Sequence, residues 1–262
     1  MVPGSRLRSL ASHLRAAPRP AAASEQEVDE DGPLAGMLVV EWTTAIQGPA
    51  AGQYLRDMGA EVIKIEGPTG DGNRHGRGTQ NDTPRVGLEP QFVSCNLGKK
   101  SLSVDVKHPE SLEVINKLLD KADVFLANFT QRALDDLGLT YEVAKARNPE
   151  IIYAVCSGFG PTGPLAGKKG FDGAAQARGG IVSITGPDAE PVMIGDVVAD
   201  TGGGVQLALG IMTALYSRER TGKGQAVKTS VRPITTLLAG SVVTPMRRCS
   251  CTARSSGASA GR

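Results

Sequence analysis

A single carboxylate precedes three consecutive glycines in the second half of the chain. Asp200 is followed, two positions later, by Gly202, Gly203 and Gly204, and the apolar spacing predicts a long helix over residues 200–219. A helix start offers unpaired N–H groups, and glycines let a ligand approach the backbone closely. Asp200 is therefore a candidate nucleophile, with the glycine N–H groups as donors to a developing oxyanion. The alternative is that Asp200 only caps the helix.

The residues before this motif alternate between strand and helix patterns. Residues 37–42 form an apolar strand candidate, Gly48-Pro49 opens a helix that ends at Gly59, and residues 61–66 alternate as a strand does. Further strands are expected at 101–106, 123–127, 151–156 and 225–231, with an extended segment at 181–185. Further helices are expected from Pro109 onward and at 133–137, 141–146 and 172–178. This alternation predicts an α/β fold with a mainly parallel, Rossmann-like sheet flanked by helices.

Ligands of such folds bind beyond the carboxyl ends of the strands. Asn128-Phe129, Ser157-Gly158 and the long loop 67–90 each follow a predicted strand. We therefore expect them to share one rim of the sheet.

The composition argues against several classes of protein. The chain has 262 residues with 40% hydrophobic content, a net charge of +2 and only 4% aromatic residues, which does not favour a nucleic-acid partner. No window approaches an uninterrupted apolar run of roughly 18 to 20 residues, so no membrane span is expected. The four cysteines have no metal-ligand spacing and form no disulfide framework, so no metal is expected.

Common nucleotide and hydrolase motifs are missing from the sequence. The first strand-to-helix turn, residues 43–49, contains no G-x-G-x-x-G, and Pro49 removes an N–H group that a pyrophosphate would use. No P-loop motif occurs, and none of the three histidines lies in a G-x-S-x-G context.

The two ends of the chain differ from its middle. Residues 1–32 begin with a segment that is rich in Arg and Ser and has no acidic residue before Glu25. This composition is typical of a transit peptide and predicts mitochondrial import. The alternatives are a basic leader without a targeting function and a cytoplasmic protein. Residues 33–231 carry the strand and helix pattern. Residues 232–262 end in a basic, Ser/Ala/Gly-rich tail that we expect to be disordered.

Seven short motifs occur in order between residues 33 and 231. They are Gly59-Ala-Glu-Val-Ile-Lys-Ile-Glu66, Asn96-x-Gly-Lys-Lys-Ser101, Ala122-Asp-Val-x-x-x-Asn-Phe129, Asn148-Pro-x-Ile-Ile-Tyr153, Ser157-Gly-Phe-Gly160, Ala199-Asp-x-x-x-Gly204 and Arg220-Thr-Gly-Lys-Gly-Gln225. Together they resemble the class III CoA-transferases, the CaiB/BaiF family that includes formyl-CoA transferase. The resemblance implies that Asp200 is the covalent nucleophile, and that an acyl-CoA and a carboxylic acid are the substrates. It implies no permanently bound cofactor, and it implies a homodimer.

The resemblance also implies contacts to coenzyme A. Asn128 and Phe129 match an Asn-Phe pair near the adenosine and pantetheine, and Lys169 matches a lysine near the cofactor. Arg74 is a further candidate, because arginine pairs well with phosphates. Each has an ordinary alternative: an Asn that ends a strand, a core Phe, a solvated Lys and a solvated loop Arg.

Several positions depart from formyl-CoA transferase. Gly67 and Asp136 stand where that enzyme uses arginines for CoA, and Ile46 stands where it has a Gln. The last difference argues against formyl-CoA and oxalate as the substrate pair.

Two other functions stay open. The same family contains 2-methylacyl-CoA racemases, which use a His in a Gly-His-Asp motif; this chain has Gly170-Phe171-Asp172, and Phe carries no proton. Family members are also longer and have a second, smaller domain, so a truncated, inactive product that only binds CoA or associates with full-length subunits is the third hypothesis.

Overall fold

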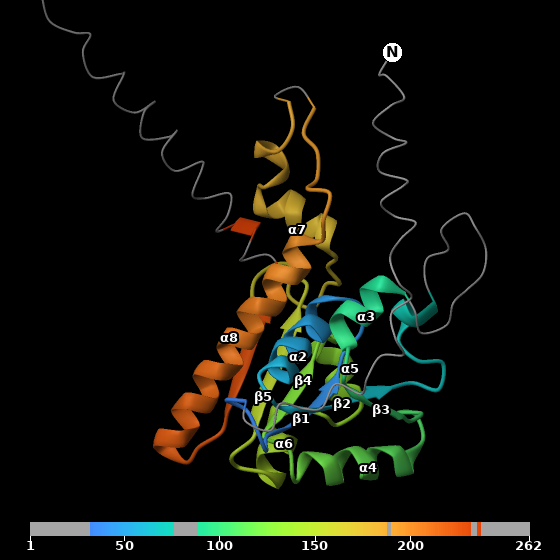
Figure 1. The fold of residues 1–262 in the computed structure, drawn as a ribbon, viewed down its shortest axis with the longest axis vertical. Helices are drawn as coiled ribbons and strands as arrows, with labels where there is room; N and C mark the ends of the chain where they lie inside the picture. The colour runs from blue at the N-terminus through green and yellow to red at the C-terminus, as the bar shows by residue number, and fades with distance from the viewer. Residues whose placement is uncertain (1–31, 76–88, 188–189, 232–234, 237–262) are drawn as a thin grey trace, which may run out of the picture.

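The computed structural model describes residues 32–75, 89–187, 190–231 and 235–236. Within these ranges strands and helices alternate along the chain, as the sequence predicts (Figure 1). Nearly all of the predicted leader and tail, and residues 76–88 of the long loop, lie outside the described residues. The import and disorder predictions for those segments are therefore not tested.

Six strands form one sheet. They are β1 (Leu38–Trp42), β2 (Glu61–Glu66), β3 (Lys100–Ser103), β4 (Val124–Ala127), β5 (Ile152–Ser157) and β6 (Gln225–Ser230). Their spatial order is β3-β2-β1-β4-β5-β6, and every pairing among the described strands is parallel. The parallel α/β prediction is confirmed. The strand order reverses between β1 and β4, and open α/β sheets bind ligands in the crevice at such a point.

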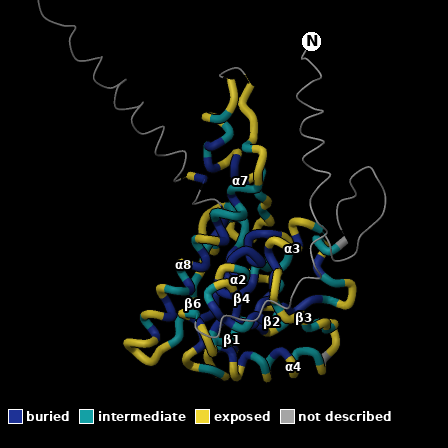
Figure 2. Tube along the Cα trace, viewed as in Figure 1, coloured by how far each residue is buried: buried dark blue, intermediate teal, exposed yellow. Residues whose placement is uncertain are grey.

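Helices cover both faces of the sheet. One pair, α2 (Gln47–Asp57) and α8 (Val198–Thr221), packs on one face, where Leu55 and Leu207 join one apolar core cluster with strand residues such as Leu126. The other face is covered by α4 (Pro109–Leu119), α5 (Gln131–Asp136) and α6 (Tyr141–Arg147), whose apolar side chains join a second cluster. The strands β1, β2, β4 and β5 between these two layers are largely buried, whereas the edge strands β3 and β6 are more exposed (Figure 2).

The close packing of α2 on α8 depends on a small residue. A Cβ atom placed on Gly204 would lie 2.9 Å from the Cβ of Ala50 and 3.0 Å from the carbonyl oxygen of Gln47. Glycine at position 204 therefore lets the two helices approach closely.

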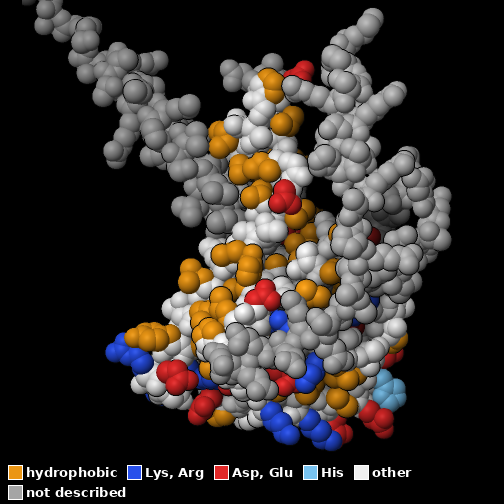
Figure 3. Space-filling view, viewed as in Figure 1, with side chains coloured by type: hydrophobic (Ala, Val, Ile, Leu, Met, Phe, Trp, Pro, Cys, Tyr) orange, Lys and Arg blue, Asp and Glu red, His pale blue; other side chains and the backbone are white. Residues whose placement is uncertain are grey.

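Among the described helices, α8 alone is long and apolar enough to cross a membrane by length and composition. Leu207, Ile211 and Ala214 bury one side of it in the core, while Val205, Leu209 and Tyr216 are exposed. Hydrophobic side chains gather over the part of the molecule formed by α7 (Asp172–Gly179) and α8 (Figure 3). The packing is that of a core helix with an apolar outer face.

The prediction of an extended segment at residues 181–185 is wrong. Gly180, at φ 89°, ends α7, and the chain continues as a 3-10 turn, η2 (Val182–Ile184). The N–H groups of Ser183 and Ile184 bond to the carbonyl oxygens of Gly180 and Ile181, so this segment pairs with no strand of the sheet. The helix α3 (Pro90–Asn96) and the 3-10 turn η1 (Gly72–His75) were not predicted.

Candidate active site

The turn between β1 and α2 is held by two asparagine side chains. The Asn128 carboxamide accepts a hydrogen bond from the N–H of Thr44 at 2.9 Å and donates to the carbonyl oxygen of Thr44 at 2.6 Å. Asn73 donates to the carbonyl oxygen of Ala45 at 3.0 Å. Ala45 has a φ of 64°, a left-handed conformation that costs a residue with a Cβ atom about 1–2 kcal/mol. These bonds hold the strained turn in place, and they join the carboxyl ends of β1 and β4.

A buried cluster of charges lies beneath this turn. Lys64 Nζ lies 3.2 Å from Glu41 Oε1 and 3.1 Å from Asp71 Oδ2, and Lys99 Nζ lies 2.7 Å from Glu41 Oε2. Lys64 also donates to the carbonyl oxygen of Thr43 at 2.9 Å. Burial lowers the pKa of Lys99, and the charge of Glu41 opposes that shift. The two carboxylates face two ammonium groups, so the cluster ties β1 and β2 together and supports the turn above them.

Asp200 lies in the first turn of α8, and another residue caps that helix. Asp172 Oδ1, from the first residue of α7, accepts hydrogen bonds from the N–H groups of Ala199 at 2.7 Å and of Asp200 at 3.2 Å. Val197 is the N-cap residue by backbone position and provides no side-chain bond. The reading of Asp200 as a mere helix cap is therefore wrong, because Asp172 provides the cap.

The carboxylate of Asp200 is half-buried and makes no hydrogen bond with any described residue. Burial, and secondly the negative charge of Asp172, raise its pKa to about 6. The ordinary pKa of an aspartate carboxyl group is 3.8. The environment instead makes Asp200 a stronger base, and hence a stronger nucleophile, than an ordinary aspartate, while most of it is still ionised at pH 7.

Asp200 opens on a cavity of about 410 Å³ at the carboxyl rim of the sheet. We call this space the rim cavity; its walls come from the turn after β1, the segment after β4, the loop after β5 and the start of α8, and include Thr44, Gln47, Asn128, Phe129, Lys168, Lys169, Phe171 and Asp200. Its volume is within the range of sites that hold small molecules. The structure thus brings Asn128-Phe129 and Ser157-Gly158 together at one rim, as the sequence predicts, and places Lys169 and Asp200 beside them.

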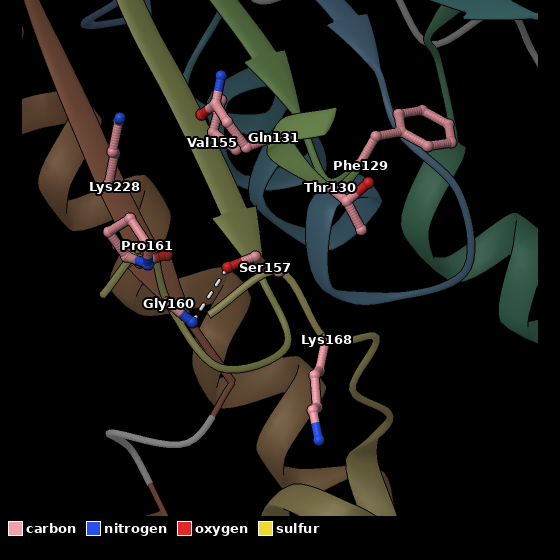
Figure 4. Close-up of a pocket in the computed structure, with 11 residues that line it drawn as sticks. Phe129, Thr130, Gln131, Val155, Ser157, Gly160, Pro161, Lys168 and Lys228 are labelled. Carbon is pink, nitrogen blue, oxygen red and sulfur yellow. Dashed lines mark hydrogen bonds between the residues drawn. The ribbon is translucent and has the colours of Figure 1, made fainter. Parts of the chain in front are cut away.

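A smaller hollow of about 200 Å³ adjoins the rim cavity. The two spaces share the lining residues Phe129, Thr130, Ser157 and Lys168. Figure 4 shows Ser157 at the end of β5, where its hydroxyl accepts a hydrogen bond from the N–H of Gly160 at 3.1 Å. An elongated ligand could therefore extend from Asp200 past Phe129 to the outer edge of the sheet.

Comparison with known proteins identifies the family. The sequence model of CoA-transferase family III matches residues 34–256. The chain belongs to this family. The match extends beyond residues 33–231, the region that contains the seven motifs, into the segment that follows.

Relatives and a solved structure agree with this assignment. The acetyl-CoA:oxalate CoA-transferase of Acetobacter aceti is 40% identical over 203 residues, which cover 76% of this chain and 51% of that protein. The succinate–glutarate CoA-transferase of Agrobacterium fabrum is 38% identical over 199 residues, covering 74% and 50%. The crystal structure of a CaiB/BaiF family protein from Brucella suis superposes with a TM-score of 0.75 at 38% identity, covering 88% of this chain and 60% of that one. The chain spans about half the length of the curated relatives it matches.

The three glycines of the family motif do not offer free N–H groups. Gly202, Gly203 and Gly204 lie inside α8, beyond its first turn, where each backbone N–H donates to the carbonyl four residues earlier. Gly203 and Gly204 instead face α2, since a Cβ atom on either would contact residues 47 to 51. The prediction that these glycines form an oxyanion hole is therefore wrong.

Arg74 does not reach the rim cavity. Its guanidinium bonds to both carboxylate oxygens of Glu66, at 2.8 and 2.6 Å, and lies 4.0 Å from the centre of the Phe92 ring. Burial works against ionisation of Glu66, but hydrogen bonds from Arg74 and Ser101 outweigh it and lower its pKa to about 2. Arg74 is thus placed as an ion-pair partner of a buried carboxylate and not as a ligand for phosphates.

Two residues of the site were not singled out from the sequence. Asp172 opens a predicted helix, and an acidic residue there suggests a cap of its own helix; nothing local indicates that it caps α8. Gln47 stands directly before Gly48-Pro49, a position that predicts a helix start and no chemistry.

Proposed function

We propose that this chain transfers coenzyme A between carboxylic acids, with Asp200 as the covalent carrier. The observation that carries the proposal is the position of Asp200: a half-buried carboxylate without a hydrogen-bond partner among the described residues faces a cavity of about 410 Å³. Family membership and relatives named as CoA-transferases support the same reaction class.

The chemistry requires only a carboxylate and a site that admits a thioester. An oxygen of Asp200 attacks the thioester carbonyl carbon; the C–O bond forms, the C–S bond breaks, and the electron pair leaves with the CoA thiolate. The thiolate then attacks the Asp200 carbonyl of the mixed anhydride, releasing the donor acid as a carboxylate and leaving an aspartyl-CoA thioester. An acceptor carboxylate repeats the two steps in reverse order and leaves as the new acyl-CoA. Covalent catalysis of this kind divides one difficult exchange into easier steps.

The walls of the rim cavity suit a CoA thioester. Phe129 contributes an apolar surface for the pantetheine arm, and the exposed ammonium groups of Lys168 and Lys169 are available for phosphates. The carboxamide of Asn128 is engaged with the backbone of Thr44, so we assign Asn128 to holding the turn and not to direct recognition of CoA.

The racemase alternative requires a second proton-transfer group. The position at which racemases carry a His does not provide one. Phe171 occupies that position, lines the rim cavity and is 72% exposed. A phenyl ring cannot exchange a proton, so the α-carbon of a 2-methylacyl-CoA would lack one of its two bases there.

A transfer assay tests the proposal. The full chain is incubated with acetyl-CoA or succinyl-CoA and a panel of mono- and dicarboxylic acids, and new acyl-CoA species are identified by mass spectrometry. We expect new acyl-CoA with wild type and none with Asp200→Asn. Folded protein that binds acyl-CoA but yields none with any acid supports the inactive, CoA-binding alternative.

Two further parts of the proposal concern location and assembly. The acid-poor leader supports mitochondrial import. To test import, residues 1–32 are fused to a fluorescent reporter, and the location of the reporter is scored with and without the arginines.

The exposed apolar side chains Val205, Leu209 and Tyr216 on α8 support association into a homodimer. Sedimentation of the full chain tests this association.

A further inference from the structure

Gln47 has a buried polar group without a partner. It is the first residue of α2, lines the rim cavity and is only 6% exposed. Its Nε2 atom is shielded from solvent and makes no hydrogen bond with any described residue. A buried amide that lacks a partner costs about 1–3 kcal/mol, so its retention beside a cavity calls for a ligand that satisfies it.

Gln47 lies against the helix that carries Asp200. A Cβ atom on Gly203 would lie 2.6 Å from Gln47 Nε2, so the absence of a side chain at position 203 makes room for the carboxamide. Gly203 follows Asp200 by three residues on α8, and residues with that spacing share one face of a helix. The carboxamide of Gln47 and the carboxylate of Asp200 therefore border the same cavity from neighbouring helices.

The backbone of Gln47 is placed by the turn before it. The hydrogen bonds of Asn128 to Thr44 and of Asn73 to Ala45 fix the chain that enters α2. Gln47 is therefore carried on a fixed stretch of backbone at the wall of the rim cavity.

Three donors close to Asp200 are already engaged. The N–H groups of Ala199 and Asp200 donate to Asp172, and the Thr44 hydroxyl donates to Asp71 at 3.2 Å. Gln47 is the side-chain donor of the rim cavity that is both buried and without a partner among the described residues.

We propose that the Gln47 carboxamide donates a hydrogen bond to the carbonyl oxygen of the acyl group as Asp200 attacks it. This inference rests on the proposed function. Negative charge develops on that oxygen while the new C–O bond forms, and it is lost when the C–S bond breaks and the CoA thiolate leaves with the electron pair. Gln47 thereby takes the part that the motif glycines, whose N–H groups are used inside α8, cannot take.

The test measures the rate at which the full chain forms a covalent adduct from acetyl-CoA, read by intact mass under single-turnover conditions. Gln47→Met keeps the side-chain length and removes the donor. Gln53→Met, on the same helix and outside the rim cavity, is the matched control. We expect the adduct rate to fall by about 10²-fold in Gln47→Met and to change less than about twofold in Gln53→Met.

Two further readouts separate catalysis from structure. Replacing an unpartnered buried amide by an apolar group should leave the melting temperature of Gln47→Met equal to or above that of wild type. The dissociation constant for CoA should stay within about threefold, because the proposed bond forms in the transition state. A second variant, Gly203→Ala, places a methyl group where the carboxamide lies and should slow adduct formation in the same direction.

The outcomes are distinguishable. A slow, stable Gln47→Met variant that still binds CoA supports the role of Gln47. Adduct formation at the wild-type rate in Gln47→Met overturns it and leaves the proposed function intact. Loss of rate that only parallels a loss of melting temperature or of CoA binding, with Gly203→Ala unaffected, also overturns it. Absence of any Asp200-dependent adduct in wild type overturns the proposed function and this inference together.

Discussion

Asp172 and Asp200 lie at the head of the same helix, α8, in different roles. Asp172 Oδ1 accepts the hydrogen bonds of two backbone N–H groups there, including that of Asp200 at 3.2 Å. The Asp200 carboxylate is left without a partner among the described residues and faces the rim cavity. One carboxylate therefore holds the helix start, and its charge raises the basicity of the other.

The first prediction concerns the pH dependence of acylation. The pKa of Asp200 is raised to about 6 by burial and by the charge of Asp172. Because the ionised form attacks, adduct formation should slow as the pH falls through about 6. Asp172→Asn removes that charge and keeps a capping oxygen, so the midpoint should move to lower pH. Initial adduct rates between pH about 5 and about 8 provide the measurement. Asp136→Asn, on α5, is the control and should leave the pH midpoint of adduct formation unchanged. If the midpoint is also unchanged in Asp172→Asn, the charge of Asp172 does not act on Asp200.

The second prediction concerns stability. A carboxyl group whose pKa is higher in the folded state binds its proton more tightly there, so the stability it contributes is present below the unfolded value, 3.8, and is lost as the pH rises through about 6. Asp200→Asn should therefore melt at a higher temperature than wild type at pH 7. The difference should shrink toward pH 4, where wild type is protonated as well. An Asn variant that melts lower than wild type at pH 7 would contradict the raised pKa.

The third prediction concerns Arg74. Arg74→Met should destabilise the fold by about 2 kcal/mol at pH 7, because the buried Glu66 loses two charge-assisted hydrogen bonds. Glu66 has a lowered pKa of about 2, so this stabilisation is present above the unfolded value, 4.5, and is lost as the pH falls toward 2. The penalty measured by denaturant unfolding should accordingly be smaller at acid pH. Arg132→Met, which removes an exposed pair on α5, should cost less than about 1 kcal/mol.

Binding separates the two interpretations of Arg74. Since the guanidinium lies outside the rim cavity, the dissociation constant for CoA should not change in Arg74→Met. A weaker affinity at unchanged stability would restore Arg74 as a phosphate ligand.

The fourth prediction concerns Lys169. Its exposed ammonium group lines the rim cavity, and the structure shows no ion pair to it within the described residues. Lys169→Ala should weaken CoA about three- to tenfold, as expected for one charge-assisted contact at an exposed site, and the loss should diminish at high salt. Lys107→Ala, on the loop after β3, is the matched control. Isothermal titration with CoA measures both, and equal affinities would remove Lys169 from the site.

Much of the fold follows from local sequence patterns. Apolar runs of strand length alternate with helical spacing, and Pro109 begins α4 where a proline at a first helical turn predicts it. The prediction of an extended segment at residues 181–185 is wrong because β-branched residues indicate a strand only where another strand is available for pairing. The helix α3 (Pro90–Asn96) was not predicted because Pro90 was assigned to the end of the Gly-rich loop 67–90.

Some features of the site follow from the sequence, and others depend on tertiary contacts. Asn128, Phe129 and Ser157 meet because their segments follow parallel strands and so lie at the carboxyl rim, as topology predicts. The start of α8 brings Asp200 to the same rim. The roles of Arg74 and of the glycines depend on partners supplied by other elements, Glu66 and α2, which no local pattern reveals. The missing hydrogen-bond partner of Gln47 Nε2 results from the packing of α2 on α8, so it could not be predicted from the sequence.

The most direct test of the account is a mass measurement on Asp200 itself. The full chain is mixed with acetyl-CoA, quenched in acid and digested, and the peptides spanning residues 198–221 are sequenced by mass spectrometry. We expect a peptide heavier by CoA less one water, with the modification on Asp200, and no such peptide from Asp200→Asn. Folded wild-type protein that binds acetyl-CoA and returns this peptide unmodified, or a modification that persists in Asp200→Asn, would contradict it.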